Sequence, residues 1–198
     1  MAPTRAPLES QTPKAIENVV STPPRFVSDA AFPPYAYIGD PQPHPRNHPN
    51  GHSRDALEVT PPAFETDKWR DSRAYLRGLD LFNHGYYWEA HEEWEGLWMA
   101  AGKKGPVSEF MKGLIKLTAA GVKIRQAQVE GAQRHARRAV EHFQRCQELA
   151  ARSDFGGFLL EDLIRFAKYV ESGAPNWSPH SGEAVAIALD RSLVPGKV

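Results

Sequence analysis

Residues 81–98 read LFNHGYYWEAHEEWEGLW, and this stretch decides the fold. Asn83-His84-Gly85 is a typical helix stop, so one helix ends there and another begins near Tyr86. Along the second helix, over about 86–99, five side chains recur at spacings of three and four and share one face: Tyr87, Ala90, His91, Trp94 and Trp98. An imidazole therefore stands inside an apolar stripe, which predicts that this helix packs within a bundle.

Helical periodicity continues on both sides of this stretch. It predicts further helices over about 66–83, 108–128, 131–152 and 158–172. The helix over 108–128 is apolar around roughly half of its circumference, with lysines on the remaining strip, as in the centre of a bundle. Since the connections are short, neighbouring helices should be antiparallel. We therefore predict an all-α fold: a compact antiparallel bundle of about five helices with an extended Pro-rich N-terminal arm.

The first third of the chain has a different composition. Residues 1–64 contain 13 of the 17 prolines, which exclude a long helix. We expect disorder over 1–24 and an arm over 25–64 whose aromatic residues pack on the body. The helical bundle is predicted over 65–173. A C-terminal tail over 174–198 should contain a short helix near Glu183–Leu189.

Composition excludes several functional classes. The chain has 24 basic and 24 acidic side chains, so no net charge attracts nucleic acid or an anionic membrane. The single cysteine, Cys146, excludes a disulfide framework and a thiolate zinc site. No apolar stretch has the length of a signal peptide or of a membrane span. We expect a cytoplasmic protein without a membrane partner, and the sequence leaves homo-oligomerisation open.

Three polar residues of the predicted 86–99 helix form the candidate site. Glu95 follows His91 by one turn, and Glu92 lies about 100° from His91 on the same side. Such a group could bind a divalent metal ion or a small ligand, with Glu92 and Glu95 as catalytic carboxylates. The side chains expected to bind a ligand are Glu89, His91, Trp94, Trp98 and Lys112.

The arm offers further ligands for a metal ion. Its run His44-Pro-Arg-Asn-His48-Pro-Asn-Gly-His52-Ser places three imidazoles within nine residues. Together with His91 and Glu95 they would complete a divalent site with an open position for water.

A structural interpretation stands beside each of these predictions. A histidine on an apolar helix face is often a hydrogen-bonded core residue, and three tryptophans on one helix are usually core residues. The arm histidines could form local hydrogen bonds or be exposed. The basic side of the 131–152 helix interleaves its arginines with Glu141 and Glu148 and has no aromatic residue for stacking bases, so no nucleic-acid partner is expected.

Residues 81–98 resemble the hallmark of the domain-of-unknown-function family number 309, which typically reads Phe-Asn-x-Gly-x-Tyr-x-Glu-Ala-His-Glu-x-Trp-Glu-x-x-Trp. A second similar block is Phe110-Met-Lys-Gly-Leu-Ile-Lys-Leu-Thr-Ala119, in which Lys112 and Lys116 stand where glutamine is usual. The arm is similar to an extension carried by some members. The resemblance implies a compact all-α bundle with no established activity, and the two lysines could act as counter-ions for the acidic helix.

Two functions remain open from the sequence. In the first, a His/Glu/Trp pocket binds a divalent metal or a small ligand and supports hydrolysis. In the second, the chain is a non-catalytic interaction or scaffold module in which the His/Glu/Trp helix is purely structural. The sequence does not decide whether the protein is an enzyme.

Overall fold

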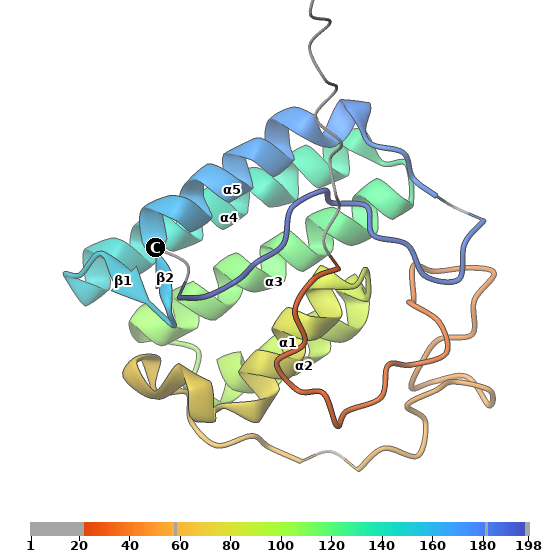
Figure 1. Ribbon diagram of the computed structural model, residues 1–198, viewed down its shortest axis with the longest axis horizontal. Coiled ribbons are helices and arrows are strands. Elements are labelled where there is room, and N and C mark those ends of the chain that lie inside the picture. Colours follow the sequence, from red (N-terminus) through yellow and green to blue (C-terminus); the bar gives the residue numbers. More distant parts are fainter. Residues whose placement is uncertain (1–21, 58, 181, 197–198) are drawn as a thin grey trace, which may run out of the picture.

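The computed structural model describes residues 22–57, 59–180 and 182–196. Of the segment 1–24, for which disorder was expected, residues 1–21 lie outside the described residues. The five α-helices of the described residues are α1 (Arg73–Asn83), α2 (Tyr87–Ala100), α3 (Gly105–Arg125), α4 (Val129–Ala150) and α5 (Leu160–Gly173). Each packs against the next along the chain, with α3 in the middle (Figure 1). The predicted all-α bundle with an extended N-terminal arm is confirmed, because no helix or strand forms between residue 22 and residue 65 among those described.

The helices α1 and α2 are antiparallel, as side-chain contacts along the pair show. Phe82 of α1 contacts Tyr87 at the start of α2, whereas Tyr75 at the start of α1 accepts a hydrogen bond from Trp94. Close approach depends on glycine at one point: a Cβ at Gly78 would lie 2.2 Å from Nε1 of Trp94. The backbone of α1 at Gly78 therefore packs directly against the indole ring of Trp94 in α2.

The region before α1 differs from the prediction of one continuous helix from residue 66. A 3-10 helix, η1 (Thr66–Asp71), ends at Ser72, where the backbone is extended. The side-chain hydroxyl of Ser72 caps α1 by accepting a hydrogen bond from the Tyr75 amide. The hydroxyl of Thr66, at the start of η1, accepts a hydrogen bond from the Gly156 amide at 2.7 Å. This hydroxyl is thus used in a long-range contact and not in a local one.

Two further differences concern the C-terminal part. Residues before α5 form a small hairpin of β1 (Asp154–Phe155) and β2 (Phe158–Leu159), turned by Gly156 and Gly157, which both have positive φ. The short helix of the tail is η2 (Ala174–Asn176), and the prediction of a helix over Glu183–Leu189 was wrong. That segment is not helical because its backbone groups bind side chains of the bundle. Arg125 donates hydrogen bonds to the carbonyls of Glu183 and Ala186, and the hydroxyl of Tyr87 accepts hydrogen bonds from the amides of Ala188 and Leu189.

Buried polar side chains of the helices hold the arm and the tail. Asp80, fully buried in α1, accepts hydrogen bonds from the amides of Phe26 (2.7 Å) and Val27 (2.8 Å) in the arm. Arg125, fully buried at the end of α3, donates to four backbone carbonyls of the tail, at Pro179, His180, Glu183 and Ala186. The two flanking segments also meet, since the Ala36 amide donates to the Ala184 carbonyl at 2.9 Å.

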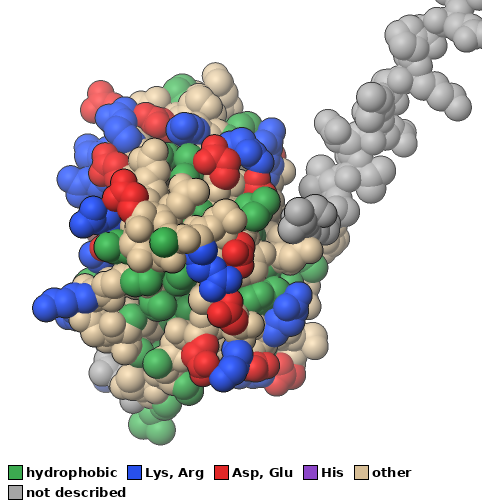
Figure 2. Space-filling model, turned by 90° about the vertical axis from the view of Figure 1, so that its left-hand side faces the viewer, with side chains coloured by type: hydrophobic (Ala, Val, Ile, Leu, Met, Phe, Trp, Pro, Cys, Tyr) green, Lys and Arg blue, Asp and Glu red, His purple; other side chains and the backbone are tan. Residues whose placement is uncertain are grey.

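Charges of both signs cover the surface. Seen from the end at which β1 and β2 lie, acidic and basic side chains intermingle over much of the molecule, and Lys and Arg side chains gather along one edge (Figure 2). No helix of the described part is long and apolar enough to cross a membrane.

Candidate functional site

The central feature of the site is Glu89, on the side of α2 that faces the arm. Its side chain is 6% exposed, and its Oε1 accepts hydrogen bonds from the Tyr37 amide (2.9 Å) and from Nε2 of His52 (3.0 Å). A carboxylate only accepts, so the proton of His52 lies on Nε2. The other carboxylate oxygen, Oε2, is buried and has no hydrogen-bond partner among the described residues.

The imidazole of His52 joins Glu89 to a hydroxyl. Its Nδ1 lies 2.8 Å from Oγ of Ser53, and its ring packs edge-on against Tyr35. Side-chain exposure of His52 is 5%, so the imidazole and the carboxylate of Glu89 are both almost completely removed from water. Hydroxyl, imidazole and carboxylate thus stand in series at the junction between the arm and α2.

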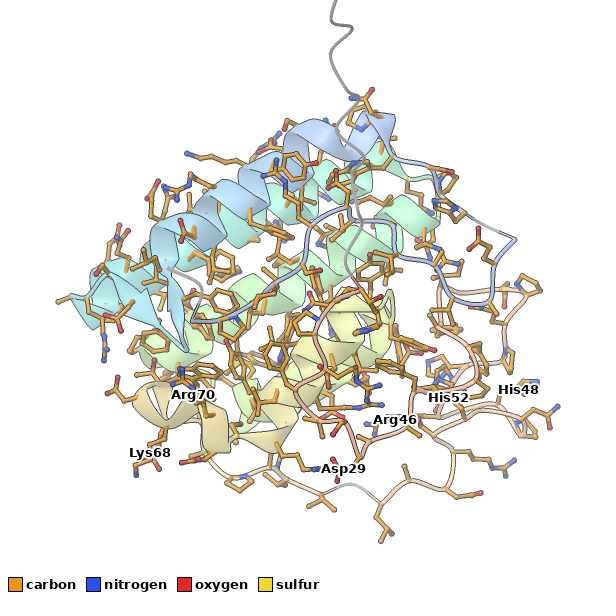
Figure 3. The ribbon with its side chains drawn as sticks, in the orientation of Figure 1. Asp29, Arg46, His48, His52, Lys68 and Arg70 are labelled. Carbon is orange, nitrogen blue, oxygen red and sulfur yellow. The ribbon has the colours of Figure 1, made fainter. Side chains whose placement is uncertain are left out.

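The second contact between the arm and α2 is more exposed. Glu92 forms an ion pair with Nε of Arg46 at 2.9 Å. Burial raises the pKa of Glu92, and the positive charge of Arg46 partly opposes this effect. Figure 3 shows Arg46 and His52 on the side of the arm nearer the helices, whereas His48 lies on its outer side.

The other two arm histidines, His44 and His48, form hydrogen bonds within the arm itself. The ring of His44 packs edge-on against Trp88, with centroids 5.5 Å apart, and its Nδ1 accepts hydrogen bonds from the amides of Arg46 and Asn47. His48 is exposed, and its Nδ1 accepts a hydrogen bond from the Asn50 amide at 3.1 Å. Both rings therefore stabilise turns of the arm.

The side chain of His91 faces α3, and the charge of Glu95 acts on it. Nδ1 of His91 lies 3.4 Å from Oγ1 of the buried Thr118. Burial lowers the pKa of His91, while the negative charge of Glu95 raises it and the positive charge of Lys116 lowers it. His91 is consequently separated from Glu89 and His52 by the width of the helix.

The remaining predicted ligand-binding residues are engaged inside the protein. Trp94 is completely buried and donates from Nε1 to the Tyr75 carbonyl. Trp98 donates from Nε1 to Oγ of Ser108 at 2.9 Å. Lys112 pairs with Glu109 of its own helix at 2.9 Å, so it is not the counter-ion of the acidic helix that the sequence suggested.

The five predicted metal ligands do not come together. Among the described residues, no group of three or more His, Cys, Asp or Glu side chains is arranged to hold a metal ion. Of the three arm histidines, His52 has a hydrogen bond to a carboxylate of α2 among the described contacts, and that carboxylate is Glu89 and not Glu95. Two surface hollows, of about 950 Å³ beside α5 and the tail and about 240 Å³ beside η1, contain no residue of α2 in their walls.

Three residues that hold the flanking segments were not predicted from the sequence. Asp80, Asn83 and Arg125 are all buried, and Asn83 both donates to the Leu193 carbonyl and accepts from its amide. Asp80 stands between two leucines, and a charged residue within an apolar run is the signal that could have revealed it.

The anchoring side chains lie in one part of the chain, from α1 to the end of α3. Residues 75–135 match the sequence model of a family described as Domain of unknown function (DUF309). The resemblance expected from the motif is confirmed over this range. No curated protein and no solved structure matched the chain. The DUF309 range contains Asp80, Asn83, Tyr87, Glu89 and Arg125, whose hydrogen-bond partners in the arm and tail lie outside it.

Proposed function

We propose that this protein is a non-catalytic binding module in which α2 is internal architecture that fastens the arm onto the bundle. The observation that carries the proposal is the environment of Glu89. One oxygen of this buried carboxylate accepts hydrogen bonds from both the backbone and an imidazole of the arm. A carboxylate used in this way compensates its desolvation by holding a chain segment in place.

The neighbouring polar residues support the same role. Glu92 pairs with Arg46 of the arm, and His91 contacts Thr118 of α3. The DUF309 range also supplies Asp80 and Arg125, which bind backbone groups of the two flanking segments. The polar residues of the matched core thus organise the rest of the chain, and the outer helix faces are left for a partner.

Calorimetric titration of the full chain with zinc, manganese and nickel tests this proposal. We expect no stoichiometric binding by the wild type, and Glu89→Gln should reduce stability, because Glu89 holds the arm. His91→Gln and Glu95→Gln serve as site variants. Saturable binding of one ion to the wild type, lost in both of these variants, would overturn the proposal in favour of a metal pocket.

One observation favours a second candidate, a hydrolytic function. Ser53, His52 and Glu89 are arranged in the order hydroxyl, imidazole, carboxylate, which is the order used to activate a serine nucleophile. In this function Nδ1 of His52 would accept the hydroxyl proton as Oγ attacks an acyl carbon, and Glu89 would hold the resulting imidazolium. The imidazolium would give the proton to the leaving group as its bond to the acyl carbon breaks, and water would then hydrolyse the acyl-serine. Labelling with a fluorophosphonate, followed by peptide mass spectrometry, distinguishes the two functions. Modification of Ser53 that is lost in His52→Gln supports hydrolysis, and an unlabelled Ser53 supports the binding module.

A further inference from the structure

The packing of α3 against α4 brings basic side chains of both helices together. At one end of the pair, Nδ1 of His142 lies 2.8 Å from Oε2 of Glu109. At the other end, a Cβ added to Gly131 would lie 3.2 Å from Cδ of Lys123. In this antiparallel register the middle of α3, at Lys116, lies opposite the part of α4 that carries the next basic residues.

Those residues are Arg134, His135 and Arg138. The charge of Arg138 acts on Lys116, and the charges of Lys116 and Lys123 act on His135. In the described parts of the chain, no carboxylate lies within ion-pair distance of Lys116, Arg134 or Arg138. The acidic residue Glu109, near one end of this helix pair, is already bound by Lys112 and His142.

The imidazole of His135 completes this basic cluster. Its Nδ1 is buried and has no hydrogen-bond partner among the described residues. Burial and, to a smaller extent, the surrounding positive charges together lower the pKa of His135 to about 4. An unpaired polar nitrogen and unpaired cations at one place are unfavourable for folding, so the cluster costs stability in the absence of an anion.

We propose that Lys116, His135 and Arg138 bind the phosphate dianion of a small phosphorylated ligand. A dianion supplies both the negative charge and the acceptor oxygens that the cluster lacks. Along α3 the cluster extends from Lys116 to Lys123, roughly 10 Å, which is room for one or two phosphate groups and not for a strand of nucleic acid. The single Phe of α4, Phe143, is buried, so no aromatic ring is available to stack on bases.

This inference goes beyond the proposed function, and none of its residues lies in the arm or contacts it through a described hydrogen bond. It also gives a physical meaning to the second sequence block. Lys116 stands where glutamine is usual in the resembling family, so a positive charge is a property of this chain that the family pattern does not require.

Calorimetric titration of the full chain with inorganic phosphate at constant ionic strength tests the inference. We expect saturable binding with one site per chain. Lys116→Gln and Arg138→Gln should each weaken it by about tenfold or more, because each removes a charged hydrogen-bond donor. Arg137→Gln is the matched control, since Arg137 lies on the same helix but pairs with Glu171 of α5. Binding to this control should equal that of the wild type.

Thermal unfolding distinguishes a loss of phosphate binding from a folding defect in the variants, because melting temperatures are compared with and without phosphate. Without phosphate, Lys116→Gln should melt at the same temperature as the wild type or higher, because it relieves repulsion. With phosphate, the wild type should be stabilised and the variant should not. Absence of saturable phosphate binding by the wild type overturns the inference, as does an equal loss in Arg137→Gln. Binding of a single-stranded oligonucleotide with steep salt dependence, without binding of phosphate, would instead identify a nucleic-acid surface.

Discussion

Glu89 binds His52 through one carboxylate oxygen and keeps the other, Oε2, buried without a hydrogen-bond partner among the described residues. The two residues are 37 positions apart in the sequence, and both side chains are almost fully buried. A buried carboxylate depends strongly on each donor that it has. The attachment of the arm to α2 should therefore be sensitive to single substitutions at this contact.

Replacing His52 by alanine should loosen the arm. The substitution removes one of two donors to Oε1 of Glu89, and we expect a loss of about 1–3 kcal/mol in the free energy of unfolding. Urea denaturation measures the loss, and the rate of tryptic cleavage after the exposed Arg54 reports on the arm itself. His48→Ala is the control, because His48 is exposed and its hydrogen bonds to described residues lie within its own turn. Equal effects of the two substitutions would contradict the anchoring role of His52.

Arg125→Met should destabilise the tail. Methionine fills part of the volume but leaves four backbone carbonyls without the donor that now satisfies them. We expect a loss of about 3 kcal/mol or more, since breaking a buried charged network is among the costly substitutions. Arg137→Met, at an exposed ion pair with Glu171, should change stability by less than about 1 kcal/mol. Guanidinium denaturation measures the unfolding free energy of both variants. Equal losses in the two variants would show that the contacts of Arg125 with the tail do not contribute to stability.

Gly78→Ala and Gly96→Ala should have opposite effects, although both glycines lie within helices. A Cβ at Gly78 would collide with the ring of the buried Trp94, and overpacking of this kind costs about 1–3 kcal/mol. At Gly96 the nearest atoms are in Pro61, at 3.4 Å, so alanine should add up to about 1 kcal/mol through helix propensity. Thermal melting followed by circular dichroism gives the sign of each change. A neutral or stabilising Gly78→Ala would mean that α1 and α2 are not so closely packed.

Stability should depend on pH through His135. Its pKa is about 4 in the folded protein, lowered by burial and by Lys116, Arg134, Lys123 and Arg138, and about 6.5 when unfolded. Between these values the unfolded chain binds a proton that the folded chain does not, so the free energy of unfolding falls as pH falls from 6.5 to 4. Above pH 7 the residue has no such effect.

The variant His135→Gln isolates this contribution from other titrating groups. Burial raises the pKa of Glu92 and Glu93, which acts in the opposite direction on acidification, but these groups are common to both proteins. The difference in unfolding free energy between wild type and variant should therefore be constant above pH 7. As the pH falls toward 4, the wild type should lose stability relative to the variant. A constant difference over the whole range would show that His135 is not held neutral.

Much of the fold followed from local patterns. The spacing of apolar residues and the stop at 83–85 placed α2 correctly, and the apolar circumference of the third helix indicated its central position. The candidate site was only partly predictable. Glu89 and His52 were both singled out, but their pairing was not, since the period of α2 says which side chains share a face and not which segment covers that face.

What the sequence by itself determined is the set of helices, because hydrophobic periodicity and stop signals act over a few residues. Only the tertiary structure decided how the polar residues are used. Asp80, Glu89 and Arg125 each bind groups more than 50 positions away, and Lys116 meets His135 only because α3 packs against α4. Such contacts depend on which surfaces the folded chain brings together, and a buried charge shows its purpose only through the partner that compensates its desolvation.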